Sequence, residues 1–266
     1  MLQAKNGCLD LPNGETDYIR FGSGVKTLVM IPGVGDGLKT VKGMALPFAL
    51  LYRSLAKDFT VYVISRRRKL VPSMTTRDMA EDLSDAMEAL SLCSASVVGV
   101  SQGGMISQWL ALDHPEKVEK LVLTVTLSRP NPVVKDVIAR WIRMADQEDY
   151  KGIMLDTAER SYSEKRLKKA RLEYKLLGSV GKPKSFDRFR IQAASCANHD
   201  AYDLLDRITC PTLVIGGDKD RIVTGEASVE IAGKIPDCKL FMYKELGHGL
   251  YEEAPDFLQR VSDFCR

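Results

Sequence analysis

The sequence predicts an α/β protein with a mostly parallel central sheet, flanked by helices and carrying a helical cap insertion. Short apolar, strand-like runs alternate with segments of helical spacing through most of the chain. These runs are apolar at consecutive positions, which is typical of strands buried on both faces of a parallel sheet. No strand-like run occurs within residues 129–206, where several helices are expected instead.

The expected strands are short runs rich in Val, Ile and Leu. They lie at 27–31, 59–65, 94–101, 120–125, 211–216 and 239–243. The expected helices have apolar residues three or four positions apart. They lie at 46–59, at about 76–90, from 102 to about 112, and at 254–264. Thr75 or Thr76 is the expected N-cap of the second of these helices, because a threonine hydroxyl can accept a hydrogen bond from a free N–H.

This pattern divides the chain into three segments. Residues 1–128 and 207–266 are expected to form the two parts of one core, and residues 129–206 the cap insertion. The insertion contains a basic stretch, 164–190, in which ten Lys and Arg residues stand against three Asp and Glu residues. One interpretation is a solvated helix face. The other is a positive field that attracts anionic substrates or a partner surface.

The composition argues against several classes of protein. Hydrophobic residues at 45% and charged residues at 27% are ordinary for a folded soluble protein, and a net charge of +3 does not support nucleic-acid binding. Six scattered cysteines without a Cys-x-x-Cys pair indicate reduced thiols in a cytoplasmic protein. The N-terminus lacks an apolar signal region, and the longest apolar run, 44–52, is too short to span a bilayer.

We therefore expect a cytoplasmic protein without a membrane or nucleic-acid partner. No glycine-rich phosphate loop opens a helix, and the three histidines lack the spacing of metal ligands. These observations predict that the protein needs no cofactor and no metal. The oligomeric state does not follow from the sequence.

A candidate nucleophile stands in Gly99-Val100-Ser101-Gln102-Gly103, at the end of a predicted strand and the start of a predicted helix. Glycines on both sides allow a turn too tight for side chains, which holds the serine where a substrate can reach it. The first N–H groups of the following helix then point toward the serine and can stabilise a developing negative charge.

His248 is the candidate base among the three histidines. It follows the strand at 239–243 on a loop, between Gly247 and Gly249, where it is free of crowding. His114 precedes a proline at a helix end and is expected to cap or pack. His199 is expected on the surface or in the insertion.

Two aspartates, Asp218 and Asp220, follow the strand at 211–216 and are candidates for the acid of a triad. Both should lie at the same edge of the sheet as Ser101 and His248, because the carboxyl ends of parallel strands meet there. Asp220 is favoured since Ile222 and the apolar residue after it can anchor its loop inward. Asp218 stands beside a glycine, as turn-forming aspartates do.

With these motifs the chain resembles the serine α/β-hydrolases nearly from end to end. Nucleophile, acid and histidine occur in that family's order, and the resemblance assigns the acid position to Asp220. It also implies an insertion where the family carries its cap. By resemblance, the backbone N–H groups of Val34 and Gln102 form the oxyanion hole, although Pro32-Gly33 stands where family members commonly have His-Gly.

A second departure from the family is the basic loop Ser65-Arg66-Arg67-Arg68-Lys69. It is either a solvated loop or a site for a substrate carboxylate or phosphate. On the second interpretation Arg67 contacts an anionic substrate. Trp141 in the insertion is a further candidate for substrate binding, against the more ordinary role of an aromatic side chain that packs a core.

The resemblance implies a carboxylesterase-like hydrolase that cleaves a small ester or lactone through an acyl-enzyme. An alternative is hydrolysis of a C–C bond in a diketone-like ring-cleavage product, with the same triad. A third possibility, of another class, is a receptor with this fold that binds a ligand with little turnover, because fold alone does not establish function.

Overall fold

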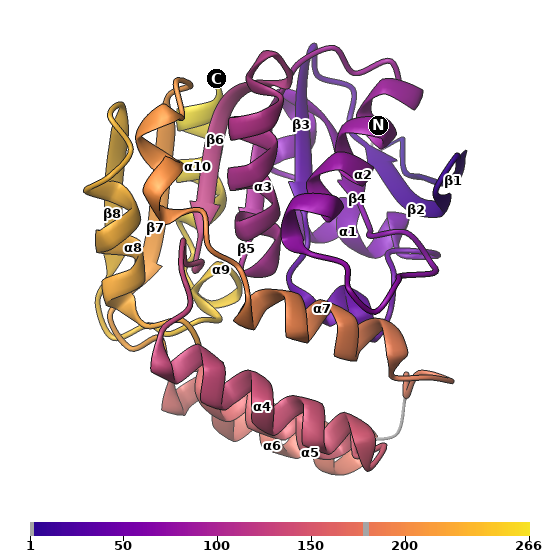
Figure 1. The fold of residues 1–266 in the computed structure, drawn as a ribbon, viewed down its shortest axis with the longest axis vertical. Coiled ribbons are helices and arrows are strands. Elements are labelled where there is room, and N and C mark those ends of the chain that lie inside the picture. The colour runs from indigo at the N-terminus through magenta and orange to yellow at the C-terminus, as the bar shows by residue number, and fades with distance from the viewer. Residues whose placement is uncertain (1–2, 178–180) are drawn as a thin grey trace.

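The computed structural model describes residues 3–177 and 181–266, which contain one eight-stranded sheet (Figure 1). The strand order is β1-β2-β4-β3-β5-β6-β7-β8. Strands β3 to β8 pair in parallel, whereas β1 and β2 form an antiparallel hairpin joined to β4 through β2. The strands are β1 (Lys5–Leu11), β2 (Gly14–Phe21), β3 (Lys26–Ile31), β4 (Phe59–Ile64), β5 (Ala95–Val100), β6 (Val118–Thr124), β7 (Thr212–Gly217) and β8 (Cys238–Tyr243).

Helices cover both faces of the sheet. One face carries α2 (Thr76–Ala89), α3 (Gln102–Asp113) and α8 (Gly225–Ala232); the other carries α1 (Ala45–Leu51), α9 (Leu250–Glu253) and α10 (Phe257–Cys265). Successive strand residues face opposite cores: Val97 packs into the first and Val98 into the second. This two-sided burial explains the continuous apolar runs and confirms the predicted α/β architecture.

Between β6 and β7 the described residues form four α-helices at the carboxyl edge of the sheet, along the lower edge in Figure 1. They are α4 (Pro132–Asp146), α5 (Tyr150–Ser161), α6 (Glu164–Leu177) and α7 (Asp187–Ala197). A separate apolar cluster joins this helical layer to the loops after the strands, with Trp141 and Phe189 packed together with Leu127 and Val223. The helical layer therefore covers the edge where strand-end residues gather.

All six predicted strands are present, with ends shifted by a few residues. The hairpin of β1 and β2 was not predicted, because β1 is largely exposed and has no apolar run. The signal that identifies it is Pro12-Asn13, two turn-forming residues between paired Leu11 and Gly14, with Gly14 at a φ of 122°.

Two predicted helices have different bounds in the structure. The helix expected at 46–59 ends at Leu51, and a short 3-10 turn, Leu55–Lys57, follows it. Leu55 stays buried, so the apolar spacing continues although the backbone changes. The final helix, expected at 254–264, begins only at Phe257 as α10, because Pro255 disfavours helical geometry in the residue before it. The short helix α9, which ends at Glu253, was not predicted.

Thr75 is the N-cap of α2. Its hydroxyl accepts a hydrogen bond from the backbone N–H of Asp78, whose carboxylate accepts one from the N–H of Thr75. This capping box confirms one of the two predicted positions. No helix in the described ranges is long and apolar enough to cross a membrane.

Candidate active site

Ser101 lies between β5 and α3 with a φ of 55° and a ψ of −119°, a strained conformation for a residue with a side chain. The turn is possible because its neighbours are glycines. A Cβ atom on Gly103 would lie 2.0 Å from the carbonyl oxygen of Ile31, and one on Gly99 would lie 2.5 Å from that of Gly103. Strand and helix thus approach closely and hold Ser101 at the turn between them.

His248 and Asp220 form a buried pair. The Nδ1 atom of His248 lies 2.8 Å from Oδ2 of Asp220, and both residues are less than a tenth exposed. The other carboxylate oxygen, Oδ1, accepts hydrogen bonds from the backbone N–H groups of Ile222 and Val223 at 2.8 and 3.0 Å. These bonds fix the carboxylate, which in turn fixes the imidazole ring.

Asp218 has a different environment. It is exposed, and its Oδ1 accepts a hydrogen bond from the backbone N–H of Glu245 at 2.7 Å. This contact closes a turn between the loops after β7 and β8. Of the two candidate acids, the structure therefore brings Asp220 to His248 and leaves Asp218 in a turn.

Ser101, Asp220 and His248 all follow strands of the parallel part of the sheet, at one edge. Within residues 3–177 and 181–266, no hydrogen bond joins Ser101 Oγ to His248. Such bonds are often long in unliganded enzymes and tighten when the substrate is in place. The three residues are of the types that serve as nucleophile, base and orienting acid in a triad.

The two expected oxyanion donors each begin a helix. Val34 is the first residue of the 3-10 helix Val34–Gly37, and Gln102 is the first residue of α3, so neither N–H has an acceptor within its own helix. The loop before Val34 packs against Ser101, because a Cβ atom on Gly33 would lie 3.3 Å from Ser101 Cβ. Both donors therefore belong to backbone that adjoins Ser101.

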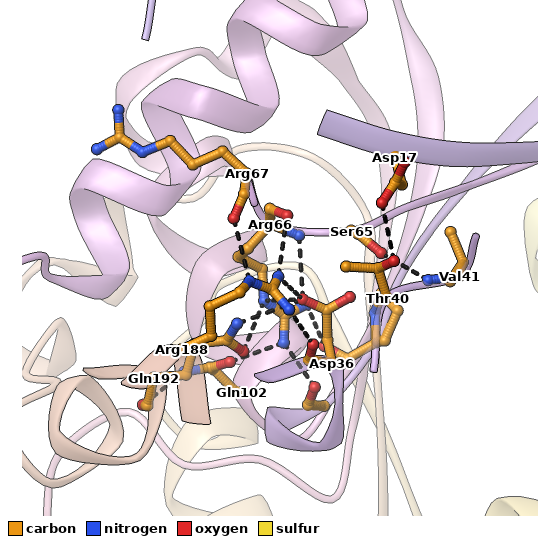
Figure 2. A network of polar contacts seen from close by, with 12 residues as sticks. Asp17, Asp36, Thr40, Val41, Ser65, Arg66, Arg67, Gln102, Arg188 and Gln192 are labelled. Carbon is orange, nitrogen blue, oxygen red and sulfur yellow. Dashed lines mark hydrogen bonds and ion pairs between the residues drawn. The ribbon is translucent and has the colours of Figure 1, made fainter. Parts of the chain in front are cut away.

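The basic loop is engaged within the protein. Arg68 pairs with Asp17 and Glu15 at 2.6 and 2.8 Å, and Arg67 pairs with Asp82 at 3.2 Å. Figure 2 shows the side chain of Arg67 pointing away from the polar network around Arg66. The structure does not bring Arg67 together with Ser101, His248 and Asp220.

Trp141 is buried in the apolar cluster of the helical layer. Its indole N–H donates a hydrogen bond to Asp156 Oδ2 at 2.9 Å, and its ring lies 6.4 Å from that of Phe189. These contacts give it a packing role within the insertion, away from the cavity described below.

His199 is buried, which corrects the expected surface position. Its Nδ1 lies 2.8 Å from the hydroxyl of Thr76, and its Nε2 lies 3.3 Å from Oε1 of Gln108. Burial lowers the pKa of His199 to about 3. His114, in contrast, lies near the surface, with Nε2 3.0 Å from the carboxylate of Glu81.

A cavity of about 540 Å³ adjoins the loop after β3, between α1, α9 and the helical layer. Gly33 and Val100, the immediate neighbours of the expected oxyanion donor Val34 and of Ser101, are part of its wall. Most of the remaining lining is apolar. These lining residues include Met30, Phe48, Leu51, Tyr52, Val63, Ala254 and Leu258.

Two charged residues also line this cavity, and sequence analysis missed them. Arg166, from α6, pairs with Glu173 at 3.1 Å. Glu252, from α9, accepts a hydrogen bond from the Tyr162 hydroxyl at 2.7 Å, and burial raises the pKa of Glu252. Burial also raises the pKa of Tyr52 to about 12. The position of Glu252, four residues after His248, is the sequence signal that places it near the site.

The chain belongs to the alpha/beta hydrolase fold family, whose model matches residues 26–173. This is the class of protein that the sheet order and the turn at Ser101 define. Among solved structures, MGS-M2, an alpha/beta hydrolase enzyme from a Medee basin deep-sea metagenome library, superposes with a TM-score of 0.85. It is 19% identical and covers 97% of this chain and 96% of its own.

Several curated hydrolases resemble the chain. The "Putative carbamate hydrolase RutD" of Caulobacter sp. (strain K31) is 27% identical over 87% of each chain. The pimeloyl-[acyl-carrier protein] methyl ester esterase of Chromobacterium violaceum is 27% identical over 82% of this chain and 86% of its own. The 2-hydroxy-6-oxo-6-phenylhexa-2,4-dienoate hydrolase of Comamonas testosteroni is 24% identical over 97% and 93%. The protein is therefore a hydrolase of this family.

Proposed function

We propose that the protein is a serine hydrolase that cleaves a small ester or lactone with Ser101, His248 and Asp220. The observation that carries the proposal is the buried 2.8 Å contact between His248 Nδ1 and Asp220 Oδ2, at the sheet edge where Ser101 occupies a strained turn. A histidine held in this way presents its other nitrogen as a base, and a strained serine turn is typical of a nucleophile.

In the proposed reaction, His248 takes the proton of Ser101 Oγ as the oxygen attacks the acyl carbon. The backbone N–H groups of Val34 and Gln102 stabilise the oxyanion, and Asp220 stabilises the imidazolium. The tetrahedral intermediate then expels the leaving oxygen, which receives the proton from His248. Water, deprotonated by His248, attacks the resulting Ser101 ester and releases the acid.

The apolar cavity supports an uncharged hydrocarbon portion in the substrate. Its walls come within one residue of Ser101 and of Val34, so a group bound there adjoins the reacting carbon. Burying such a group contributes roughly 0.8 kcal/mol per methylene. We therefore infer a short- to medium-chain or aromatic acyl group.

The test of this proposal is the hydrolysis of p-nitrophenyl esters by the wild-type protein and by the Ser101→Ala variant. We expect wild-type turnover and a loss of about 10⁶-fold in kcat for Ser101→Ala, the scale for removal of a triad nucleophile. A variant that keeps most of the wild-type activity contradicts the assignment. Ligand binding by a wild-type protein without turnover favours the receptor alternative.

Hydrolysis of a C–C bond is the second candidate. It is favoured by Arg166 in the cavity wall, since a guanidinium there suits a substrate carboxylate, and by the resemblance to a dienoate hydrolase. Turnover of an acidic diketone without turnover of simple esters supports this candidate over the first.

A further inference from the structure

Arg66 lies directly behind the oxyanion loop, residues 32–36, and has no role in the reaction as proposed above. Its side chain is only 3% exposed. It donates hydrogen bonds to the carbonyl oxygens of Pro32 and Gly33 at 2.7 and 2.5 Å. A third bond reaches Oε1 of Gln102 at 2.7 Å (Figure 2). A fourth bond, from Nε, reaches Oε1 of Gln192 at 3.2 Å. The guanidinium is thus used within the protein, not offered to a substrate anion.

The bond to Gly33 bears on the oxyanion hole through covalent geometry. The carbonyl of Gly33 and the N–H of Val34 belong to one planar peptide group, so fixing the carbonyl also fixes the direction of the N–H. A charged donor on the carbonyl also polarises the peptide and strengthens its N–H as a donor. The same Nη2 atom holds the side chain of Gln102, whose backbone supplies the other donor.

We propose, on the basis of the serine-hydrolase function above, that Arg66 is a positioning residue for the oxyanion hole. It orients and polarises the Gly33–Val34 peptide and anchors Gln102. The charge that it carries also lies close behind the place where the oxyanion forms, which favours the transition state over the neutral substrate.

The helical layer supports this arrangement. Asp36 lies 3.7 Å from Nε of Arg66, and its Oδ2 accepts hydrogen bonds from Arg188 Nη2 at 2.8 Å and from Gln192 Nε2 at 3.3 Å. Gln102 Nε2 donates to the carbonyl of Gln192 at 2.7 Å. Helix α7 and the oxyanion loop are therefore joined through one buried polar network. This network gives the buried Arg66 the partners that a buried charge needs.

The experiment compares Arg66→Met and Arg66→Lys with Arg68→Met. Arg68 is in the same loop but pairs with Asp17 and Glu15, so Arg68→Met removes an ion pair of similar kind away from the oxyanion loop. For each protein, kcat and KM are measured on one ester. The affinity for a boronic acid, which forms a tetrahedral adduct with an activated serine, is measured in parallel. Fluorophosphonate titration counts the intact sites, and rates are given per site.

For Arg66→Met we expect kcat to fall about 10- to 100-fold with KM nearly unchanged, since the contact acts mainly in the transition state. Boronic acid affinity should fall in parallel. Arg66→Lys keeps a cation opposite Asp36, so it should fold and show an intermediate loss of kcat. Arg68→Met should lower thermal stability and keep the wild-type kcat.

A purely structural role for Arg66 predicts a lower melting temperature with unchanged kcat and boronic acid affinity per titrated site, and that result overturns the inference. If Arg66→Met does not fold, the test rests on Arg66→Lys. In that case a kcat and a boronic acid affinity within about twofold of the wild-type values contradict the proposal. A wild-type protein that neither hydrolyses esters nor reacts with the fluorophosphonate contradicts the proposed function instead.

Discussion

Two aspartates two positions apart have different roles because of the hydrogen bonds that each makes. Asp220 is buried, with two backbone N–H groups on one oxygen and His248 on the other. Asp218 is exposed and closes a turn through Glu245. Sequence reasoning favoured Asp220 because apolar residues follow it, and the structure shows why this matters: the N–H groups of these same residues hold its carboxylate.

This difference predicts the effects of two matched substitutions. Asp220→Asn should lower kcat about 10⁴-fold, because an amide favours the wrong tautomer of the histidine. Asp218→Asn keeps an acceptor oxygen for the turn and should change kcat by less than about threefold. Steady-state kinetics on one ester checks both, and a larger loss for Asp218→Asn would reverse the assignment of the acid.

His199 makes a prediction about stability and pH. Its pKa is about 3 in the folded protein, against a value of 6.5 for a free side chain, because burial disfavours the charged ring. Between these values the unfolded chain binds a proton that the folded protein does not. The stability that the neutral ring contributes to the folded protein is therefore fully present above pH 6.5, and it is lost as the pH falls toward 3.

Urea unfolding from pH 7 to 4 tests this prediction. We expect His199→Asn to lower the stability at pH 7, through the lost contacts with Thr76 and Gln108, and to flatten the dependence on pH. His114→Asn, at the surface, is the matched control and should keep most of the wild-type slope. An unchanged slope in His199→Asn would show that other groups govern acid unfolding.

At the scale of elements, the turn between α5 and α6 is docked on the loop that carries His248. The carbonyl of Ser161 accepts a hydrogen bond from Gly249 N–H at 2.9 Å, and Ser163 N–H donates to Glu253 at 3.1 Å. Tyr162 contributes its bond to Glu252 at 2.7 Å. The helical layer thus contacts the residue next to the candidate base.

Gly249→Ala tests this contact. A Cβ atom on Gly249 would lie 2.6 Å from the ring of Tyr162, so the turn or the histidine loop must move. We expect kcat to fall about 10-fold or more, because small displacements of catalytic groups are costly. In Gly233→Ala the nearest atom would be 3.5 Å away, and both glycines have negative φ values. Equal activity of the two variants would show that the docked turn does not position His248.

The sequence predicted the elements that have a regular apolar pattern, and it missed the features that depend on tertiary contacts. The six strands were found because each is a short run of apolar residues, even the edge strand β8, which is only partly buried. The β1–β2 hairpin was missed because β1 is exposed, and the role of the basic loop was left open because its partners are distant in sequence. Arg66, for example, meets Gln192, which is 126 positions away.

The apolar cavity exists only at the scale of the whole molecule. Its lining comes from β3, β4, β5, α1, α6, α9 and α10, together with loop residues between these elements. Strand periodicity predicted that Ser101, Asp220 and His248 would lie at one edge. It carried no information about Arg166 and Glu252, whose approach depends on how the helical layer docks.

Ala254→Phe tests the role of this cavity. The larger side chain fills part of the space, and we expect kcat/KM for an octanoate ester to fall about 10-fold or more while that for an acetate ester stays within about threefold. Acetate serves as the internal control for folding and for the triad. Equal changes for both esters would show that the acyl group binds elsewhere.

The most direct test of an activated Ser101 is the intact mass of the protein after treatment with a fluorophosphonate. The account predicts one adduct on the wild-type protein and none on Ser101→Ala. Because Asp220 orients the base, adduct formation on Asp220→Asn should be slow. A wild-type protein that stays unmodified, or an adduct that persists on Ser101→Ala, would contradict the assignment of Ser101 as the nucleophile.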